Sequence, residues 1–150
     1  MTPYLGRFAP SPTGPLHPGS LLAALGSWLL ARHAGGQWWV RVEDVDPPRT
    51  VPGAIDQQLA CLTALGLASD GPIVRQSQRD ALYQRALERL LDEGTAFACH
   101  CSRSELEASG GIHRRCVRQP RPGRLPAVRL RIPDGELVFQ DRIQGEFRQD

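Results

Sequence analysis

The sequence predicts an α/β fold in which helices connect the strands of a parallel sheet. Up to residue 94, short apolar runs typical of strands alternate with longer segments in which leucine and alanine recur at helical spacing. A glycine closes each helical segment. From residue 95 this alternation stops and three of the four cysteines follow. We therefore expect a parallel-sheet domain over 1–94 and a smaller insertion with connecting strands over 95–150.

The predicted strands are short runs of branched and aromatic residues bounded by glycine, proline or acids. They cover 4–9, 38–42, 73–74 and 128–132, with one or two more between 137 and 147. The three predicted helices cover 19–34, 51–65 and 79–93. In the second helix we expect Leu59, Leu62 and Leu65 to face the core.

Composition excludes several classes of function. A net charge of +2 leaves no basic tail that could bind nucleic acid by charge alone. All 18 cations are arginine, so a Schiff-base lysine or a phosphate-loop lysine is excluded within this chain. The N-terminus has no secretory signal, and the longest apolar stretch, 21–31, is far shorter than the ~20 residues of a membrane span. We therefore expect a cytoplasmic protein with no membrane partner.

A proline-rich loop over 10–15 leads from the first strand into the first helix. His17, Pro18 and Gly19 follow where that helix should begin. A helix N-terminus favours phosphate, so His17 would donate to a phosphate there. Pro18 suits the first helical position, and Gly19 would let a planar ring approach the backbone. The alternative is a proline-rich surface turn with an exposed histidine.

A second motif places Glu43, Asp44 and Asp46 directly after the second strand. Ligands of open parallel sheets bind at the carboxyl ends of the strands. Acids at that edge could hold an ammonium group, a ribose or a metal. The alternative is the solvated start of a loop.

Together these motifs closely resemble the start of the glutamyl-tRNA synthetase family, which belongs to the class I aminoacyl-tRNA synthetases. The resemblance is carried by Arg7-Phe8-Ala9-Pro10-Ser11-Pro12-Thr13-Gly14, Leu16-His17-Pro18-Gly19-Ser20-Leu21 and Arg41-Val42-Glu43-Asp44-Val45-Asp46. Further details are similar to a shorter paralogous branch, which transfers glutamate to the queuosine base of tRNA(Asp). These are Gly19-Ser20-Leu21 with Ala23-Ala24-Leu25, Asp46-Pro47-Pro48-Arg49 and Gln76-Ser77-Gln78-Arg79. The match is good over 4–116 and loose beyond.

The resemblance implies the first half of a class I synthetase Rossmann-type sheet with a small zinc-binding insertion. It also implies an ATP-dependent ligase that uses L-glutamate and ATP with Mg²⁺. Arg7 would bind a carboxylate of glutamate, Glu43 its α-ammonium group, and the segment from Phe8 through Ala9 and Pro10 to Ser11 would line the pocket.

The segment from His17 to Ser20 occupies the family's His-Ile-Gly-His signature, which implies ATP binding at all four residues and a catalytic role for His17, Gly19 and Ser20. The chain departs from this signature at two positions. Ser20 keeps a hydroxyl donor, whereas Pro18 removes an N–H.

The insertion carries a candidate zinc site. Cys99 and Cys101 lie two residues apart, and His113 and Cys116 lie three apart, a spacing common for tetrahedral zinc. His100 is a competing fourth ligand, although an extended segment would turn it away from both cysteines. The alternative is two chance cysteines in a buried strand beside a surface histidine. In the shorter branch a tyrosine stands where His113 lies, and the gap to the last cysteine is one residue longer.

The remaining cysteine, Cys61, and the tryptophans at 28, 38 and 39 are predicted to lie in the core. The family completes its site with a second half-sheet and a lysine-bearing loop, and this chain contains no lysine. We therefore expect an N-terminal piece that is inactive alone. Two alternatives remain: a synthetase that charges tRNA(Glu), and a non-catalytic zinc- and RNA-binding module that kept the pocket residues by descent.

Overall fold

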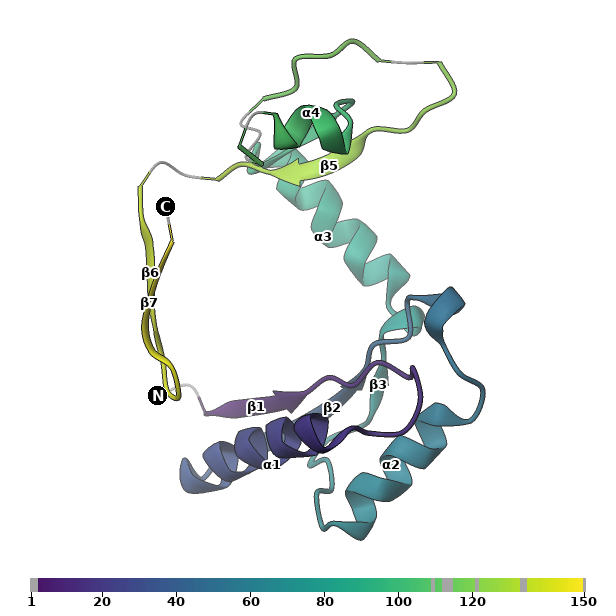
Figure 1. Cartoon of the computed structure of the whole chain (residues 1–150), viewed down its shortest axis with the longest axis vertical. Coiled ribbons are helices and arrows are strands. Elements are labelled where there is room, and N and C mark those ends of the chain that lie inside the picture. Colours follow the sequence, from purple (N-terminus) through teal and green to yellow (C-terminus); the bar gives the residue numbers. More distant parts are fainter. Residues whose placement is uncertain (1–2, 109, 112–114, 121, 133–134, 150) are drawn as a thin grey trace. The chain divides into compact units, whose positions relative to one another are not determined.

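The computed structural model describes residues 3–108, 110–111, 115–120, 122–132 and 135–149 (Figure 1). The chain divides into two compact units, Met1–Tyr83 and Gln84–Asp150. The predicted boundary between the parallel-sheet domain and the insertion, between residues 94 and 95, stays a prediction. No helix among the described residues is long and apolar enough to cross a membrane.

The first unit is built on a three-stranded parallel sheet, as predicted. Its strands are β1 (Leu5–Phe8), β2 (Gln37–Val42) and β3 (Val74–Arg75), in the order β1-β2-β3. Helix α1 (Pro18–His33) connects β1 to β2, and α2 (Ala54–Ala64) lies between β2 and β3 in the chain. Parallel strands need such helical crossovers, which is why the alternating pattern of the sequence predicts this topology.

One face of the sheet packs beneath both helices. Phe8, Trp38 and Val40 point to this face and form the core with residues of α1 and α2. Helix α1 comes close to β1 at Gly6, where a Cβ atom would lie 3.1 Å from the carbonyl oxygen of Ser27. Glycine therefore fits this close contact better than a larger residue, which would need its neighbours to shift. Alternate strand residues, including Arg7 and Arg41, point to the opposite face.

Helix α2 differs from its prediction in its start and in its buried side. It begins at Ala54 because Gly53 precedes it with a left-handed φ of 78°. Its buried residues, Ala54, Gln58 and Leu62, are spaced by four. This spacing rotates Leu65 away from the core, and Leu65 is 56% exposed. The expectation that Leu65 faces inward was wrong.

The second unit contains two antiparallel strand pairs and a short helix. Strand β4 (Ala96–Cys99) pairs with β5 (Ala127–Leu130), and β6 (Leu137–Asp141) pairs with β7 (Gly145–Gln149). Helix α3 (Asp80–Asp92) enters this unit, and α4 (Arg103–Glu107) follows β4.

The sequence prediction missed β4 and α4. The strand consists largely of small residues, which give a weak strand signal. The helix carries a recognisable start signal, because Ser102 and Glu105 form a capping box around its first turn.

Other core predictions were confirmed only in part. Trp38 is fully buried, whereas Trp28 and Trp39 keep part of their surface exposed. Cys61 is half-buried as well. Two further short helices, η1 (Pro47–Arg49) and η2 (Gln76–Gln78), lie between the elements that the sequence predicts.

The carboxylate of Asp70 joins α1 to the start of β2. It accepts hydrogen bonds from Arg32 Nη1 at 2.6 Å and Nη2 at 2.8 Å, and from the Trp38 N–H at 2.7 Å. The Arg32 guanidinium and, second, the Trp38 N–H hold the pKa of Asp70 below its usual range. The ionised form of Asp70 therefore stabilises the first unit.

We predict that Asp70→Asn lowers the free energy of unfolding at pH 7 and has a smaller effect near pH 2. The lowered pKa means that the unfolded chain takes up the proton more readily, so the contribution is complete above about pH 4 and is lost as pH falls through the folded-state pKa. Urea unfolding at both pH values measures this difference. Asp92→Asn, an exposed carboxylate on α3, serves as the control. An equal loss at both pH values would contradict the prediction.

Candidate active site and metal centre

All three parallel strands end at one edge of the sheet, at Phe8, Val42 and Arg75. The proline-rich loop leaves this edge after β1, and the acidic motif leaves it after β2. The η2 turn follows β3 at the same edge. The carboxyl edge of a parallel sheet is where ligands of such folds bind. The predicted first and second motifs are therefore brought together.

The loop after β1 is held by hydrogen bonds to its carbonyl groups. The backbone N–H of Glu43 donates to Pro10 O at 2.9 Å, and that of Val51 donates to Pro12 O at 2.8 Å. Pro10 and Pro12 are themselves buried, whereas Ser11 is exposed and Ala9 is half-buried. The loop is thus a fixed connection between the end of β1 and the start of α1.

Gln58 on α2 supplies the other restraint on this loop. Its Nε2 donates to the carbonyl oxygens of Ser11 at 3.0 Å and Gly14 at 2.6 Å. Gln58 is only 3% exposed and is the one buried polar residue among those the structure describes. Sequence reasoning missed it. The available signal was its position, four residues after Ala54 and four before Leu62, where a polar side chain on the buried side of a helix needs a hydrogen-bond partner.

His17 is the N-cap of α1. Its Nδ1 accepts a hydrogen bond from the Gly19 N–H at 3.1 Å, and Pro18 takes the first helical position as predicted. Because Nδ1 is an acceptor here, the neutral ring carries its proton on Nε2. The exposed His17 ring can therefore donate from Nε2 to an anion at the helix N-terminus. Ser20 is half-buried in the same first turn.

Arg7 and Glu43 flank the carboxyl edge with opposite charges. Arg7 is exposed, and no described side chain forms a hydrogen bond or ion pair with it. Glu43 is half-buried, and its Oε1 lies 2.5 Å from Nη2 of Arg41. Phe8 points to the other face, where its ring stacks on Trp38 with centroids 6.3 Å apart. Phe8 therefore supports the site from the core, while Arg7 faces solvent.

Asp44 ties the end of β2 to the turn after β3. Its carboxylate accepts from the Ser77 N–H at 2.9 Å and from the Ser77 hydroxyl at 2.7 Å. Burial alone would raise the pKa of Asp44. The hydrogen bonds from Ser77 and the charge of Arg75 together outweigh burial, so the pKa lies below its usual value. Asp44 is thus ionised and occupied by Ser77, and Asp46 is paired with Arg49 at 2.6 Å. Glu43 is paired with Arg41 through Oε1, and its second carboxylate oxygen could accept from a ligand.

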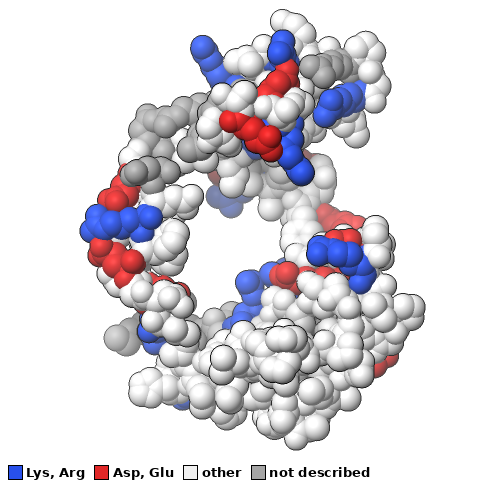
Figure 2. All heavy atoms as spheres, viewed as in Figure 1, with Lys and Arg blue, Asp and Glu red and all other residues white. Residues whose placement is uncertain are grey.

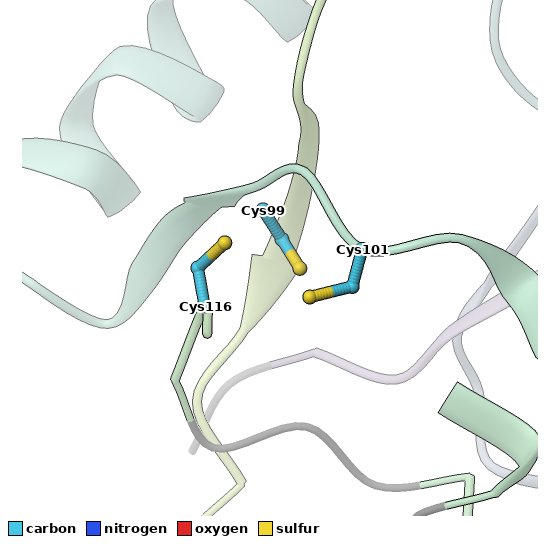
Figure 3. Close-up of side chains that lie close together, drawn as sticks. All are labelled: Cys99, Cys101 and Cys116. Carbon is cyan, nitrogen blue, oxygen red and sulfur yellow. The ribbon is translucent and has the colours of Figure 1, made fainter. Parts of the chain in front are cut away.

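A separate cluster of cysteines lies in the second unit. The Sγ atoms of Cys99, Cys101 and Cys116 all lie within 4.8 Å of one another. Figure 3 shows the three side chains turned toward a common point. Cys99 and Cys101 are buried and Cys116 is half-buried. Three thiols so arranged could bind a metal ion, since thiolates are preferred ligands of zinc.

The fourth ligand is less well placed. His113 lies outside the described residues. His100 is described, but its ring does not belong to the group of ligand atoms. Its backbone N–H instead donates to Cys116 Sγ at 3.2 Å. The expectation that the His100 ring turns away from the cysteines stays a prediction.

Neighbouring groups make the three thiols chemically unequal. Hydrogen bonds from the backbone of His100 and Arg118 lower the pKa of Cys116. The backbone of Val117 lowers the pKa of Cys101, but burial and the adjacent Cys99 and Cys116 raise it more. A bound metal ion would favour the thiolate form of all three cysteines and would balance their negative charges.

An ion pair fixes the segment that carries Cys116. Arg118 Nη2 lies 2.6 Å from Glu105 Oε1, and Glu105 also accepts from the backbone N–H of Ser102 at 2.7 Å. The hydrogen bonds from Ser102 and the charge of Arg118 lower the pKa of Glu105 to about 2. Glu105 thereby joins Ser102, which follows Cys101, to Arg118, which lies two residues after Cys116.

Comparison with known proteins identifies relatives of the whole chain. The model of the family "tRNA synthetases class I (E and Q), catalytic domain" matches residues 5–148. The chain is 64% identical over 149 residues to a glutamyl-Q tRNA(Asp) synthetase of Xanthomonas campestris, covering 99% of this chain and 50% of the relative. A protein of the same name from Ectopseudomonas mendocina is 52% identical over 99% of this chain and 51% of the relative.

Solved structures give the same family at lower identity. A glutamate tRNA ligase of Elizabethkingia meningosepticum, crystallised in complex with its amino acid, matches with a TM-score of 0.74 and 30% identity. That match covers 97% of this chain and 36% of the other. The chain spans about half the length of the curated relatives it matches.

We predict that Gln58→Leu destabilises the first unit by roughly 2–4 kcal/mol. The substitution leaves the carbonyl groups of Ser11 and Gly14 without their donor, and each unpaired buried acceptor costs about 1–3 kcal/mol. Equilibrium urea unfolding measures the loss. Gln57→Leu, at the exposed neighbouring position, is the control. Equal effects of the two substitutions would show that the amide does not hold the loop.

Proposed function

The chain belongs to the class I tRNA synthetase family for glutamate and glutamine, and we propose that it forms part of an enzyme that activates L-glutamate with ATP and transfers it to queuosine in tRNA(Asp). The names of the relatives, at 64% and 52% identity over almost the whole chain, support this substrate pair. The observation that carries the proposal is the meeting of Arg7, Glu43 and the His17 helix cap at one sheet edge.

Arg7 and Glu43 are suited to the two ends of an amino acid with an acidic side chain. The guanidinium of Arg7 has no described partner, so it is free to bind a carboxylate through paired N–H donors. The carboxylate of Glu43 would accept from the α-ammonium group. Arg41 holds Glu43 from one side at 2.5 Å, which fixes the direction in which Glu43 can meet this group. Ala9, Pro10 and Ser11 line the approach to the pocket.

The N-terminus of α1 would bind the phosphates of ATP. An anion there would meet the Nε2–H of His17 and the positive end of the α1 dipole, while the N–H groups of Gly19 and Ser20 donate to Nδ1 and to the carbonyl oxygen of His17. Pro18 contributes no N–H and serves to start the helix. In the reaction, the α-carboxylate of glutamate attacks the α-phosphorus of ATP, pyrophosphate leaves, and the glutamyl group then passes to queuosine with release of AMP. Mg²⁺ bound with ATP would supply positive charge at the phosphates.

The cysteine cluster would hold one structural zinc ion. Cys99, Cys101 and Cys116 supply three thiolates within 4.8 Å of one another, a donor set that fits zinc. His113 is the fourth ligand we propose. The site would join β4 to the segment before β5, which no described disulfide does, since all four cysteines are free thiols.

A second candidate is the charging of tRNA(Glu), because the solved structures that match are glutamate tRNA ligases. Both activities share the activation of glutamate and differ in the acceptor. Transfer of labelled glutamate to tRNA(Asp) bearing queuosine, to tRNA(Asp) lacking it, and to tRNA(Glu) distinguishes them. The proposal requires transfer to the first alone, by the protein in its longest natural form. Transfer only to tRNA(Glu) would refute it in favour of the charging enzyme.

In the protein in its longest natural form, we predict that Arg7→Ala raises the KM for glutamate by a factor that corresponds to roughly 2–5 kcal/mol, the cost of leaving the carboxylate of bound glutamate without its charged partner. The KM for ATP should change little, because Arg7 lies on β1 and is not part of the helix cap that would bind phosphate. Glutamate-dependent ATP–pyrophosphate exchange, measured without tRNA, gives both constants. An equal rise in both would mean that Arg7 is structural.

We predict about one zinc ion per chain after purification from zinc-supplemented medium, as expected of a closed four-ligand site. Cys116→Ser should reduce the zinc content strongly, whereas Cys61→Ser should leave it unchanged, because Cys61 lies on α2 in the other unit. Elemental analysis of the purified proteins measures the ratio. Substoichiometric zinc in the unaltered protein would argue against the site.

A further inference from the structure

The sheet face opposite α1 and α2 contains a hollow that is lined by three arginines. Its volume is roughly 270 Å³. It lies wholly within the first unit and is lined by Leu5, Gly6, Arg7, Trp39, Val40, Arg41, Val74 and Arg79. Arg7 and Arg41 come from β1 and β2, while Arg79 follows the η2 turn. The strand alternation that buries Phe8 and Trp38 on one face places these arginines on the other.

The charges around this hollow are not balanced by the described residues. Glu43 is the one described acid that forms an ion pair with any of the three arginines, and it binds Arg41. The Nε atoms of Arg41 and Arg79 are both buried without a hydrogen-bond partner. Buried donors without acceptors and like charges in one pocket are both unfavourable. An anion bound in the hollow would relieve both.

The backbone of Arg79 is held firmly in place. Its N–H donates to Gln76 O at 3.0 Å, and its carbonyl oxygen accepts from the Leu82 N–H at 2.8 Å. Arg79 thus occupies the junction between η2 and the first turn of α3. Because the backbone of Arg79 is fixed on this short turn, less conformational entropy is lost when its guanidinium binds a ligand.

The uncharged walls of the hollow limit the size and type of the anion. Leu5, Trp39 and Val74 offer apolar surface beside the arginines. The Trp39 ring lies directly against Gly71, where a Cβ atom would come within 2.6 Å of Cε2, so the ring has little freedom to move. At about 30 Å³ for each water molecule, the hollow has room for a small organic acid.

We propose that Arg79 is a substrate-binding residue that, together with Arg7, binds the side-chain carboxylate of glutamate in this hollow. The inference rests on the proposed function for the identity of the acid. Its chemistry, an oxyanion between two guanidinium groups, would also suit inorganic phosphate. Glutamine has the same shape without the charge, so the hollow would favour glutamate over glutamine.

The test is an NMR titration of the purified chain, following the Nε–Hε signals of its arginines. Glutamate, glutamine and inorganic phosphate are the separate ligands. We expect glutamate to shift the Arg7 and Arg79 signals together, with glutamine at least tenfold weaker. Arg79→Gln should weaken glutamate binding at least tenfold, and Arg79→Lys should restore part of it. Arg75→Gln, which removes an exposed arginine of β3 outside the hollow, should leave binding unchanged.

The outcomes separate this inference from the proposed function. Glutamate binding that shifts Arg7 but not Arg79, and survives Arg79→Gln, would overturn the inference and leave the function standing. Phosphate binding that depends on Arg79, without glutamate binding, would confirm an anion pocket but overturn glutamate as its ligand. The signal of Arg79 in the unaltered chain decides the matter even if Arg79→Gln fails to fold.

Discussion

The hydrogen bonds of Gln58 to the loop after β1 are the constraint on which the proposed active site depends. Arg7 stands just before this loop and His17 just after it, so the loop sets the relation between them. A loop rich in proline cannot donate enough N–H groups to close on itself. Its carbonyl groups must therefore find donors elsewhere, and Gln58, Glu43 and Val51 provide them. Helix α2 thus holds the loop at the carboxyl edge of the sheet through Gln58, although α2 does not itself line that edge.

The sequence predicted the parallel sheet, α1 and the position of both motifs because these depend on local patterns. The start of α1 follows from Pro18 and from a side chain that can cap it at His17. The role of Gln58 could not be predicted in the same way, since its partners at Ser11 and Gly14 lie more than forty residues away in the chain. Its burial follows from the i,i+4 row of α2, whereas the prediction counted leucines three residues apart.

The exposed leucines of the first unit show a related limit of apolar spacing. In α1 the buried residues are Ala24 and Ala31, while Leu22 is 71% exposed. Small side chains let α1 lie close to β1 at Gly6. The face of α1 that turns inward is therefore the one with small residues, and not the one with the larger leucines. Figure 2 shows the result as a broad uncharged area over α1 and α2 on the face in view. Periodicity predicts that a helix forms, but the tightest backbone contact selects its buried side.

The ion pair between Arg41 and Glu43 explains how one edge of the sheet can hold a carboxylate beside two arginines that have no described partner. Without Arg41, the carboxylate of Glu43 would be the natural partner for the nearest unpaired guanidinium, and the site would neutralise itself. With Arg41 bound to Glu43 at 2.5 Å, Arg7 and Arg79 stay without a described partner. The sheet register enforces this arrangement, because Arg41 and Glu43 alternate with buried Val42 and therefore share a face. An acid already satisfied by one arginine can still accept from an ammonium group, since a carboxylate has two oxygens. Under the proposed function, the excess of guanidinium over carboxylate in the hollow would select an acidic side chain.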